Sequence, residues 1–175
     1  YGKGDKKNFA SIISLIKKTI PSTAYQNNSL FDGILKEKDI VILVTPIDSE
    51  APDGRMILPQ VMAIRDVLDN NCINIVLKET ELEYFLKSTH IRPRIVVTDS
   101  QAFNKVCKII PHDFPLTGFS ILFAKLKGNF NAFLKGTPTI DLLNDGDCVL
   151  ILESCTHRVS CDDIGQFKIP KWIKE

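Results

Sequence analysis

Several features that would point directly to a function are missing from this 175-residue sequence. Lys and Arg number 22 against 21 Asp and Glu, and a formal net charge of +1 provides no strong field to attract nucleic acid or anionic lipid. No apolar run approaches the roughly 18 residues that a membrane-spanning helix needs. The phosphate-binding patterns Gly-x-x-x-x-Gly-Lys-Ser/Thr and Gly-x-Gly-x-x-Gly do not occur, nor does the hydrolase pattern Gly-x-Ser-x-Gly. These absences argue against a nucleic-acid binder, a membrane span and a phosphate loop.

Cysteine is scarce and odd in number. The five residues are Cys72, Cys107, Cys148, Cys155 and Cys161. An odd count within an α/β pattern argues against a secreted disulfide framework and predicts a reducing, cytoplasmic location. The first three lie in apolar stretches, where a cysteine usually behaves as a small buried hydrophobe.

Apolar runs alternate with amphipathic segments along most of the chain. The runs predict strands buried on both faces at 40–44, 73–77, 95–97 and 148–152. Between them, the spacing of apolar residues predicts helices over 56–68, 79–87, 103–110 and 119–134, the third capped by Asp99. This order predicts an α/β fold with a mainly parallel sheet, helices on both faces, and the start of a second α/β domain.

The first thirty residues carry a different pattern. Phe9, Ile12, Ile16 and Ile20 have near-helical spacing, and Pro21 ends the predicted helix. The polar, aperiodic stretch that follows is typical of a linker. Because this apolar stripe needs a packing partner and the chain begins at Tyr1 without Met, we expect the sequence to be part of a larger protein.

The most specific chemistry follows the apolar run 149–152. Cys155-x-His157 comes directly after it, with Cys161, Asp162 and Asp163 close behind. Open α/β sheets place their sites at the carboxyl ends of strands, and thiolates beside an imidazole suit iron–sulfur clusters or zinc. Two or three ligands cannot complete a tetrahedral site, and a surface loop with incidental thiols is an equally good interpretation from spacing alone.

A second candidate is the loop after the first strand. It carries Asp48, Glu50, Asp53 and Arg55 at the predicted carboxyl edge of the sheet. These side chains could bind a metal or a small-molecule substrate. Capping of the following helix, whose dipole favours acidic residues before its N-terminus, is the favoured interpretation.

Three segments resemble the HydF family, the GTPase scaffold of [FeFe]-hydrogenase maturation. Residues 153–172 read ESCTHRVSCDDIGQFKIPKW, residues 44–60 read VTPIDSEAPDGRMILPQ and continue with AIRDVL at 63–68, and residues 98–103 read TDSQAF. Together these matches cover most of the chain from about Phe31 onward. The two long segments are specific, whereas the short one adds little alone.

The resemblance implies a domain organisation. Residues 1–22 would be the last helix of an upstream GTPase domain, and residues 23–30 a linker. Residues 31–144 would be a dimerisation domain, and residues 145–175 the beginning of an iron–sulfur cluster domain. A phenylalanine-rich helix is a candidate for the dimer interface, with an ordinary core helix as the alternative; its residues are Phe119, Phe123, Phe130 and Phe133.

The resemblance also implies a function. The parent protein would hold a [4Fe–4S] cluster and a di-iron precursor for transfer to apo-[FeFe]-hydrogenase, together with other maturation proteins. Cys155 and His157 match the first half of the family's cluster motif, and the second half, His-Cys-x-x-Cys, is missing. GTP would bind the upstream domain, so this chain is expected to lack GTPase activity. The alternatives are a small-molecule-binding α/β enzyme that uses loop 48–55 and an interaction module with incidental cysteines.

Overall fold

The computed structural model describes residues 6–19, 29–47, 54–152 and 164–174. The chain divides into two compact units, Tyr1–Phe130 (unit 1) and Asn131–Glu175 (unit 2). This division lies before the boundary near Asn144 that the sequence suggested. Within the described ranges, no helix is both long and apolar enough to cross a bilayer.

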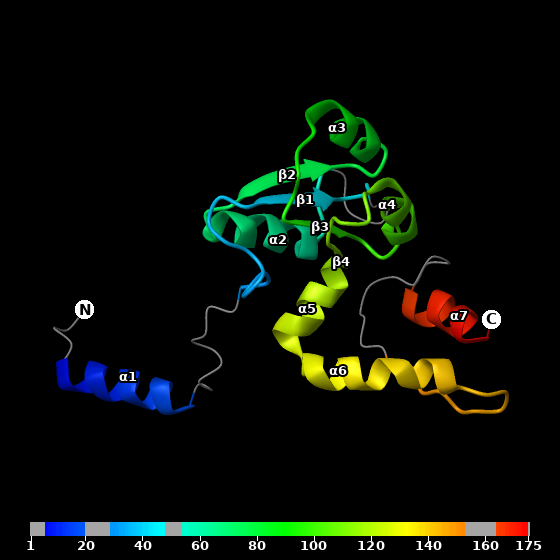
Figure 1. Cartoon of the computed structure of the whole chain (residues 1–175). Coiled ribbons are helices and arrows are strands. Elements are labelled where there is room, and N and C mark those ends of the chain that lie inside the picture. Colours follow the sequence, from blue (N-terminus) through cyan, green and yellow to red (C-terminus); the bar gives the residue numbers. More distant parts are fainter. Residues whose placement is uncertain (1–5, 20–28, 48–53, 153–163, 175) are drawn as a thin grey trace. The chain divides into compact units, whose positions relative to one another are not determined.

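Unit 1 is built on a four-stranded sheet in the order β2-β1-β3-β4, with every pair of neighbours parallel (Figure 1). The strands are β1 (Ile40–Val44), β2 (Ile73–Leu77), β3 (Ile95–Thr98) and β4 (Leu116–Gly118). In the register, Ile42 lies beside Ile75 of β2 and Val96 of β3. The predicted α/β class and its parallel sheet are confirmed.

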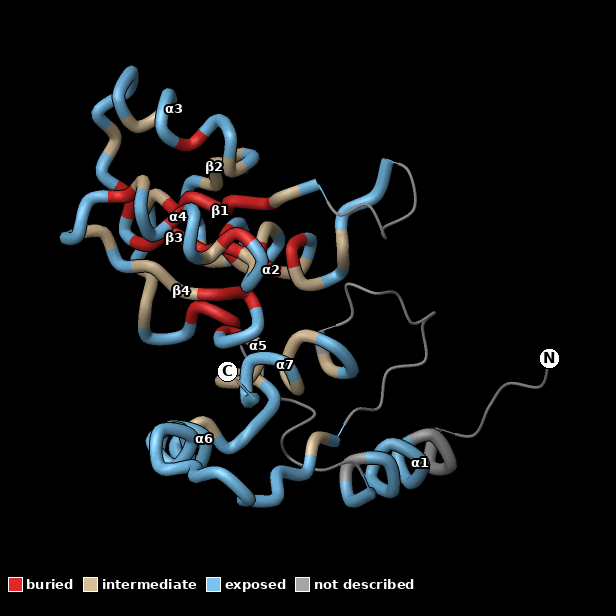
Figure 2. The backbone as a smooth tube through the Cα atoms, turned by 90° about the vertical axis from the view of Figure 1, so that its right-hand side faces the viewer, coloured by how far each residue is buried: buried red, intermediate tan, exposed pale blue. Residues whose placement is uncertain are grey.

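Helices cover both faces of this sheet. On one face lie α2 (Leu58–Asp69) and α5 (Phe119–Lys127), and on the other lie α3 (Leu82–Thr89) and α4 (Phe103–Ile109). Because successive side chains of a strand point to opposite faces, β1 contributes Val41 and Leu43 to one core and Ile42 and Val44 to the other. Figure 2 shows the buried residues concentrated along β1 and β3.

Hydrogen bonds to α2 fix the start of this domain. Ser29 Oγ donates to Asp66 Oδ2 at 2.8 Å, and the Phe31 backbone N–H donates to the same oxygen at 3.1 Å. Asn70 Nδ2 donates to Ser29 Oγ at 3.0 Å. Leu30 and Phe31 are buried in the core beside Val67. The segment predicted as a linker therefore ends in core residues; residues 20–28, including Pro21, are not among the described ones.

The predicted N-terminal helix is confirmed as α1 (Lys6–Thr19). Its apolar residues Ile12, Ile13, Leu15 and Ile16 are exposed. This helix is amphipathic, as the spacing of its isoleucines predicted.

The described part of unit 2 is helical. It contains α6 (Phe130–Gly136, which begins at the last residue of unit 1), the 3-10 helix η2 (Thr137–Leu142), the π-helical turn η3 (Ile164–Lys168) and α7 (Ile169–Lys174). The strand predicted at Cys148–Leu152 is wrong, because these residues pair with no strand and Leu150 and Leu152 are 81% and 86% exposed. A strand needs a neighbour for its backbone hydrogen bonds, and the described residues of unit 2 provide none.

Two further elements differ from prediction. β4 was missed because Leu116–Gly118 is only three residues long and continues directly into α5. The helix predicted over 119–134 is two helices, because Gly128 adopts an extended conformation between α5 and α6.

Candidate functional site

The predicted cluster ligands lie outside the described residues. This applies to Cys155 and His157, and equally to Cys161, Asp162 and Asp163. Among the residues that the structure does describe, no three His, Cys, Asp or Glu side chains are grouped so that they could hold a metal ion. Cys155 and His157 therefore stay predictions from the sequence.

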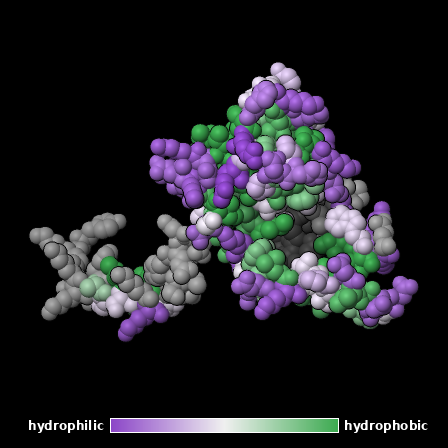
Figure 3. Space-filling model, in the orientation of Figure 1, coloured by the Kyte–Doolittle hydropathy of each residue, from purple (hydrophilic) through white to green (hydrophobic). Residues whose placement is uncertain are grey.

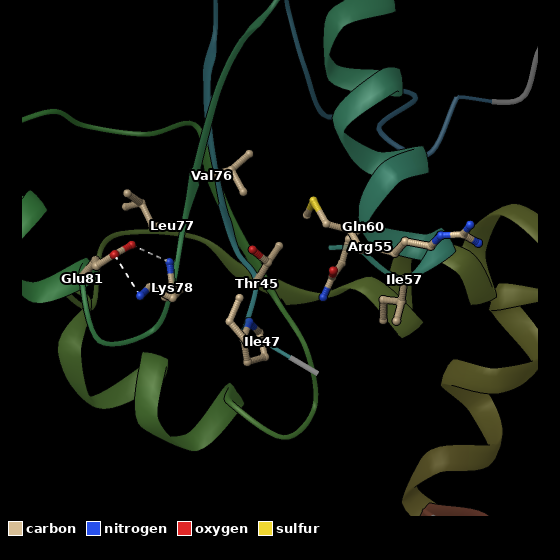
Figure 4. A pocket seen from close by; sticks show the side chains of 11 residues that line it. Thr45, Ile47, Arg55, Ile57, Gln60, Val76, Leu77, Lys78 and Glu81 are labelled. Atoms are coloured by element: carbon tan, nitrogen blue, oxygen red, sulfur yellow. Dashed lines mark hydrogen bonds and ion pairs between the residues drawn. The ribbon is translucent and has the colours of Figure 1, made fainter. Parts of the chain in front are cut away.

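A pocket of about 200 Å³ opens at the carboxyl edge of β1 and β2 (Figure 4). Three segments form it: the residues after β1, the start of α2 and the end of β2. Its lining residues are mostly apolar; they are Thr45, Pro46, Ile47, Arg55, Met56, Ile57, Gln60, Val76, Leu77, Lys78 and Glu81. Of the four charged residues of the acidic loop only Arg55 is described, since Asp48, Glu50 and Asp53 lie in the range 48–53.

Two of the three charged residues that line this pocket, Lys78 and Glu81, are paired with each other. Glu81 accepts a hydrogen bond from the Lys78 backbone N–H at 3.0 Å, and its other oxygen lies 3.4 Å from Lys78 Nζ. That backbone N–H, and to a smaller extent the ammonium group, lower the pKa of Glu81. Arg55 extends away from this pair (Figure 4). The pocket therefore offers an apolar surface, one ion pair and the guanidinium group of Arg55.

Open sheets of this order usually bind ligands between the carboxyl ends of their two central strands. In this chain, side chains of the protein lie at that place. In the order β2-β1-β3-β4 the chain leaves β1 and β3 toward opposite faces, and a crevice is expected between their carboxyl ends. Gln60 Nε2 donates to Asp99 Oδ2 at 2.8 Å across this point, and Thr98 Oγ1 donates to the Val44 carbonyl at 3.2 Å. Gln60 is buried. Side chains of the protein itself therefore occupy the crevice.

The same bond corrects the predicted role of Asp99. α4 begins at Phe103, and the residue before it, Ala102, provides no side-chain cap. Asp99 lies too early to be the N-cap, and its carboxylate instead accepts from Gln60. The sequence carried a signal for this contact, because Gln60 stands in the buried row of α2 with Ala63 and Val67, where a polar side chain needs a partner.

The three described cysteines differ in exposure. Cys72 is buried with its Sγ 3.0 Å from the Lys36 carbonyl, and burial raises the pKa of this thiol. Its predicted burial is confirmed. Cys107 and Cys148 are exposed, so their predicted burial is wrong. Cys107 follows the buried Val106 on α4, and a step of about 100° along the helix turns it toward solvent.

An open backbone edge lies along β2. Ile73 donates its N–H to the Asp39 carbonyl and Leu77 accepts from the Thr45 N–H, both at 2.8 Å on the β1 side. Because successive residues of a strand direct their backbone groups to opposite edges, Asn74 and Val76 direct theirs away from the sheet. Ile73 and Val76 are also 52% and 41% exposed. No strand among the described residues pairs with this side of β2, so the edge presents backbone groups and apolar side chains that another strand can use.

A second apolar row on α2 lies beside this edge. The helix packs against β2, and Asn74 Nδ2 donates to the Ile64 carbonyl at 2.9 Å. Ala63 and Val67 face the core, whereas Leu58, Val61 and Leu68 are exposed on another side of the helix. These three residues and Val76, whose side chain points to the α2 face of the sheet, are called the β2–α2 surface below. Exposed apolar side chains gathered in this way are typical of a protein–protein contact.

The phenylalanine-rich helix does not form part of the β2–α2 surface. Phe119 is buried in the core, and Phe123 packs against the same cluster. Of the four phenylalanines only Phe133, on α6, is exposed. The alternative interpretation, an ordinary core helix, is correct for α5. Sequence spacing could not distinguish the two because core and interface rows have the same period.

Comparisons with known proteins agree with this picture. Residues 30–128 match the family model described as the hydrogen maturase F dimerization domain, which covers more than half of the chain. Residues 131–175 match the model described as the hydrogen maturase F tetramerization domain. The two matches meet where the structure divides unit 1 from unit 2. None of the curated proteins compared with this chain matches it.

Proposed function

Because this chain belongs to the hydrogen maturase F family, we propose that it is the self-associating part of a scaffold that carries a [4Fe–4S] cluster and a di-iron precursor to apo-[FeFe]-hydrogenase. Its two matched domains indicate self-association and a role in hydrogenase maturation. GTP, in this proposal, acts on an upstream domain. The single observation that carries the self-association is the open edge of β2, which lies within the range matched by the dimerization model.

Two copies can join through this edge. In a contact with two-fold symmetry each copy uses the same surface, and two β2 strands then run antiparallel. The outward backbone groups of Asn74 and Val76 supply hydrogen bonds, and the apolar residues of the β2–α2 surface lose contact with water. Such pairing satisfies the backbone groups that an edge strand otherwise leaves to water. The scaffold would thus be held together by a sheet that continues from one copy to the next.

The side chains at residues 155–161 are of the kinds that bind a [4Fe–4S] cluster, but they are fewer than the cluster needs. Cys155 and Cys161 offer thiolates and His157 an imidazole, and these are the ligands that iron–sulfur centres use. A [4Fe–4S] cluster takes four ligands, and this stretch contains three. Cys155 and His157 are proposed as contributors to a cluster site, and no transfer step is derived from them.

The interface is tested by changing one backbone N–H. Val76→Pro removes the outward N–H of β2 and places the proline ring against any incoming strand, while the bonds to β1 use Ile73, Ile75 and Leu77 instead. We expect the variant to raise the dissociation constant of this contact at least about tenfold, measured by sedimentation velocity. Val76→Thr is the control, because it changes the side chain and keeps the N–H. Equal association of the two variants would rule out the β2 edge.

The cluster contribution is tested separately. The chain is reconstituted with iron and sulfide without oxygen, reduced, and examined by low-temperature EPR. A [4Fe–4S]⁺ signal that Cys155→Ala abolishes and Cys107→Ala keeps would identify Cys155 as a ligand, since Cys107 is an exposed thiol of unit 1. Identical spectra for the two variants would remove Cys155 from the site.

A further inference from the structure

The pocket at the carboxyl edge of β1 and β2 has the lining of a small-molecule site. Outside it, hydrophilic residues cover α3, at the top of Figure 3. The lining itself is mainly apolar, and Ile57, Val76 and Leu77 belong to it. Ligand sites are typically apolar clefts that contain a few well-placed polar groups. Two polar side chains of this pocket, Thr45 and Gln60, are buried.

The hydroxyl group of Thr45 has no hydrogen-bond partner in the described part of the chain. Thr45 is 7% exposed, and its backbone N–H donates to the Leu77 carbonyl at 2.8 Å, but no described residue bonds to its side chain. By contrast, Thr98 at the end of the neighbouring strand donates its hydroxyl to the Val44 carbonyl. A buried hydroxyl group without a partner destabilises the folded state. The Thr45 hydroxyl is therefore available to a group that enters the pocket.

The Gln60 side chain adds a buried acceptor to the same pocket. Gln60 is 3% exposed, and its Nε2 donates to Asp99 Oδ2 at 2.8 Å. Because a carboxylate only accepts, this bond fixes which end of the amide faces Asp99. The other end is Oε1, and no described residue donates to it. An occupant that donates one hydrogen bond and accepts another would satisfy both Gln60 and Thr45.

The charged residues of the lining lie at the entrance of the pocket, since Arg55, Lys78 and Glu81 are all exposed. Lys78 and Glu81 form their ion pair on one side, and Arg55 lies on the other (Figure 4). No ion pair or hydrogen bond joins Arg55 to another described residue. The described lining therefore has one positive charge in excess, on a guanidinium group that can bind a carboxylate through two parallel hydrogen bonds.

We propose that this pocket binds a small aliphatic hydroxy acid. Its carboxylate binds Arg55 at the entrance, its short chain lies against Ile57, Val76 and Leu77, and its hydroxyl donates to Gln60 Oε1 and accepts from Thr45 Oγ1. The volume of about 200 Å³ equals that of about six or seven waters in the liquid. An acid with a chain of about five carbons is of this size. The site is additional to the scaffold function proposed above.

Three related molecules test this ligand class on the full chain by ligand-observed NMR titration. They are 5-hydroxypentanoate, pentanoate, which lacks the hydroxyl, and 1-pentanol, which lacks the carboxylate. We expect 5-hydroxypentanoate to bind with a dissociation constant of about 1 mM or lower, as suits so small a ligand. Pentanoate and 1-pentanol should each bind at least about tenfold more weakly, because each leaves one end of the site without its partner.

Two variants test the residues. Thr45→Val keeps the shape of the side chain and removes the hydroxyl, and Arg55→Gln removes the charge from an exposed position. Each is expected to raise the dissociation constant of 5-hydroxypentanoate at least about fivefold. Thr45→Val should not lower the thermal unfolding midpoint, because its hydroxyl makes no bond to a described residue. Thr117→Val is the control, since it makes the same change on β4, outside the pocket, and should leave binding unchanged.

Three results would each overturn the inference. The first is no saturable binding of 5-hydroxypentanoate up to about 10 mM, as expected if the pocket holds only water. The second is binding of pentanoate or 1-pentanol as tight as that of the hydroxy acid. The third is unchanged binding by Thr45→Val or Arg55→Gln. Neither residue belongs to the β2–α2 surface, so the ligand site and the self-association fail independently.

Discussion

Replacing Asp66 by alanine is expected to loosen the attachment of residues 29–31 to α2. The Asp66 carboxylate accepts from Ser29 Oγ at 2.8 Å and from the Phe31 N–H at 3.1 Å. Each hydrogen bond to a charged group contributes about 1.5–3 kcal/mol, and partial exposure places these two near the lower end. Together they predict a loss of about 3 kcal/mol in the free energy of unfolding.

The assay is urea unfolding followed by circular dichroism. With a slope of about 1–3 kcal/mol per molar urea, this loss lowers the unfolding midpoint by roughly 1–3 M. Because association stabilises the folded state, both proteins must be compared at one concentration.

Asp69→Ala is a matched control on the same helix. Asp69 bonds to Arg65 at 2.8 Å in a pair whose side chains are 75% and 55% exposed, and such surface pairs contribute little. We expect the midpoint of this variant to stay at the wild-type value. If Asp66→Ala lowers the midpoint no more than Asp69→Ala, the carboxylate does not anchor the start of the domain.

Three further outcomes are expected. Cys72 should be alkylated far more slowly than Cys107 near pH 8, because a raised pKa leaves less thiolate at a given pH; peptide mass spectrometry measures both. Leu82→Ala should destabilise unit 1 by about 2–5 kcal/mol in thermal unfolding, since it is the only buried residue of α3. Gln60→Ala should speed amide hydrogen exchange in the segment after β3, because the bond to Asp99 that fills the crevice is lost; exchange at the wild-type rate would contradict this role.

The sequence predicted the central part of the sheet well. Ile40–Val44 and Ile95–Val97 are continuous apolar runs because both faces of β1 and β3 are covered by helices, and this pattern is visible in the residues themselves. Periodicity likewise predicted α2 and α3 to within a few residues. These elements could be predicted because the apolar pattern within each segment reflects which of its faces are buried.

Strand pairing, sheet edges and long-range side-chain contacts could not be predicted, because each depends on residues far away in the sequence. Cys148–Leu152 has the composition of a buried strand, but burial depends on a partner that the run itself cannot specify. The open edge of β2 follows from the strand order, which no residue of β2 encodes. Gln60 could have been noted as a polar residue in an apolar row, yet its partner Asp99 is 39 residues away along the chain.

The central position of β1 has a consequence for synthesis of the chain. Its neighbour Ile95 on β3 lies 54 residues after Val41 in the sequence. At about 5–20 residues per second, the ribosome needs roughly 3–10 seconds to make that stretch. During this interval the run Ile40–Val44, with high β-propensity and no charge, has only part of its sheet to join. We therefore expect chaperones that bind growing chains to recognise β1 first, and to release it once β3 has emerged.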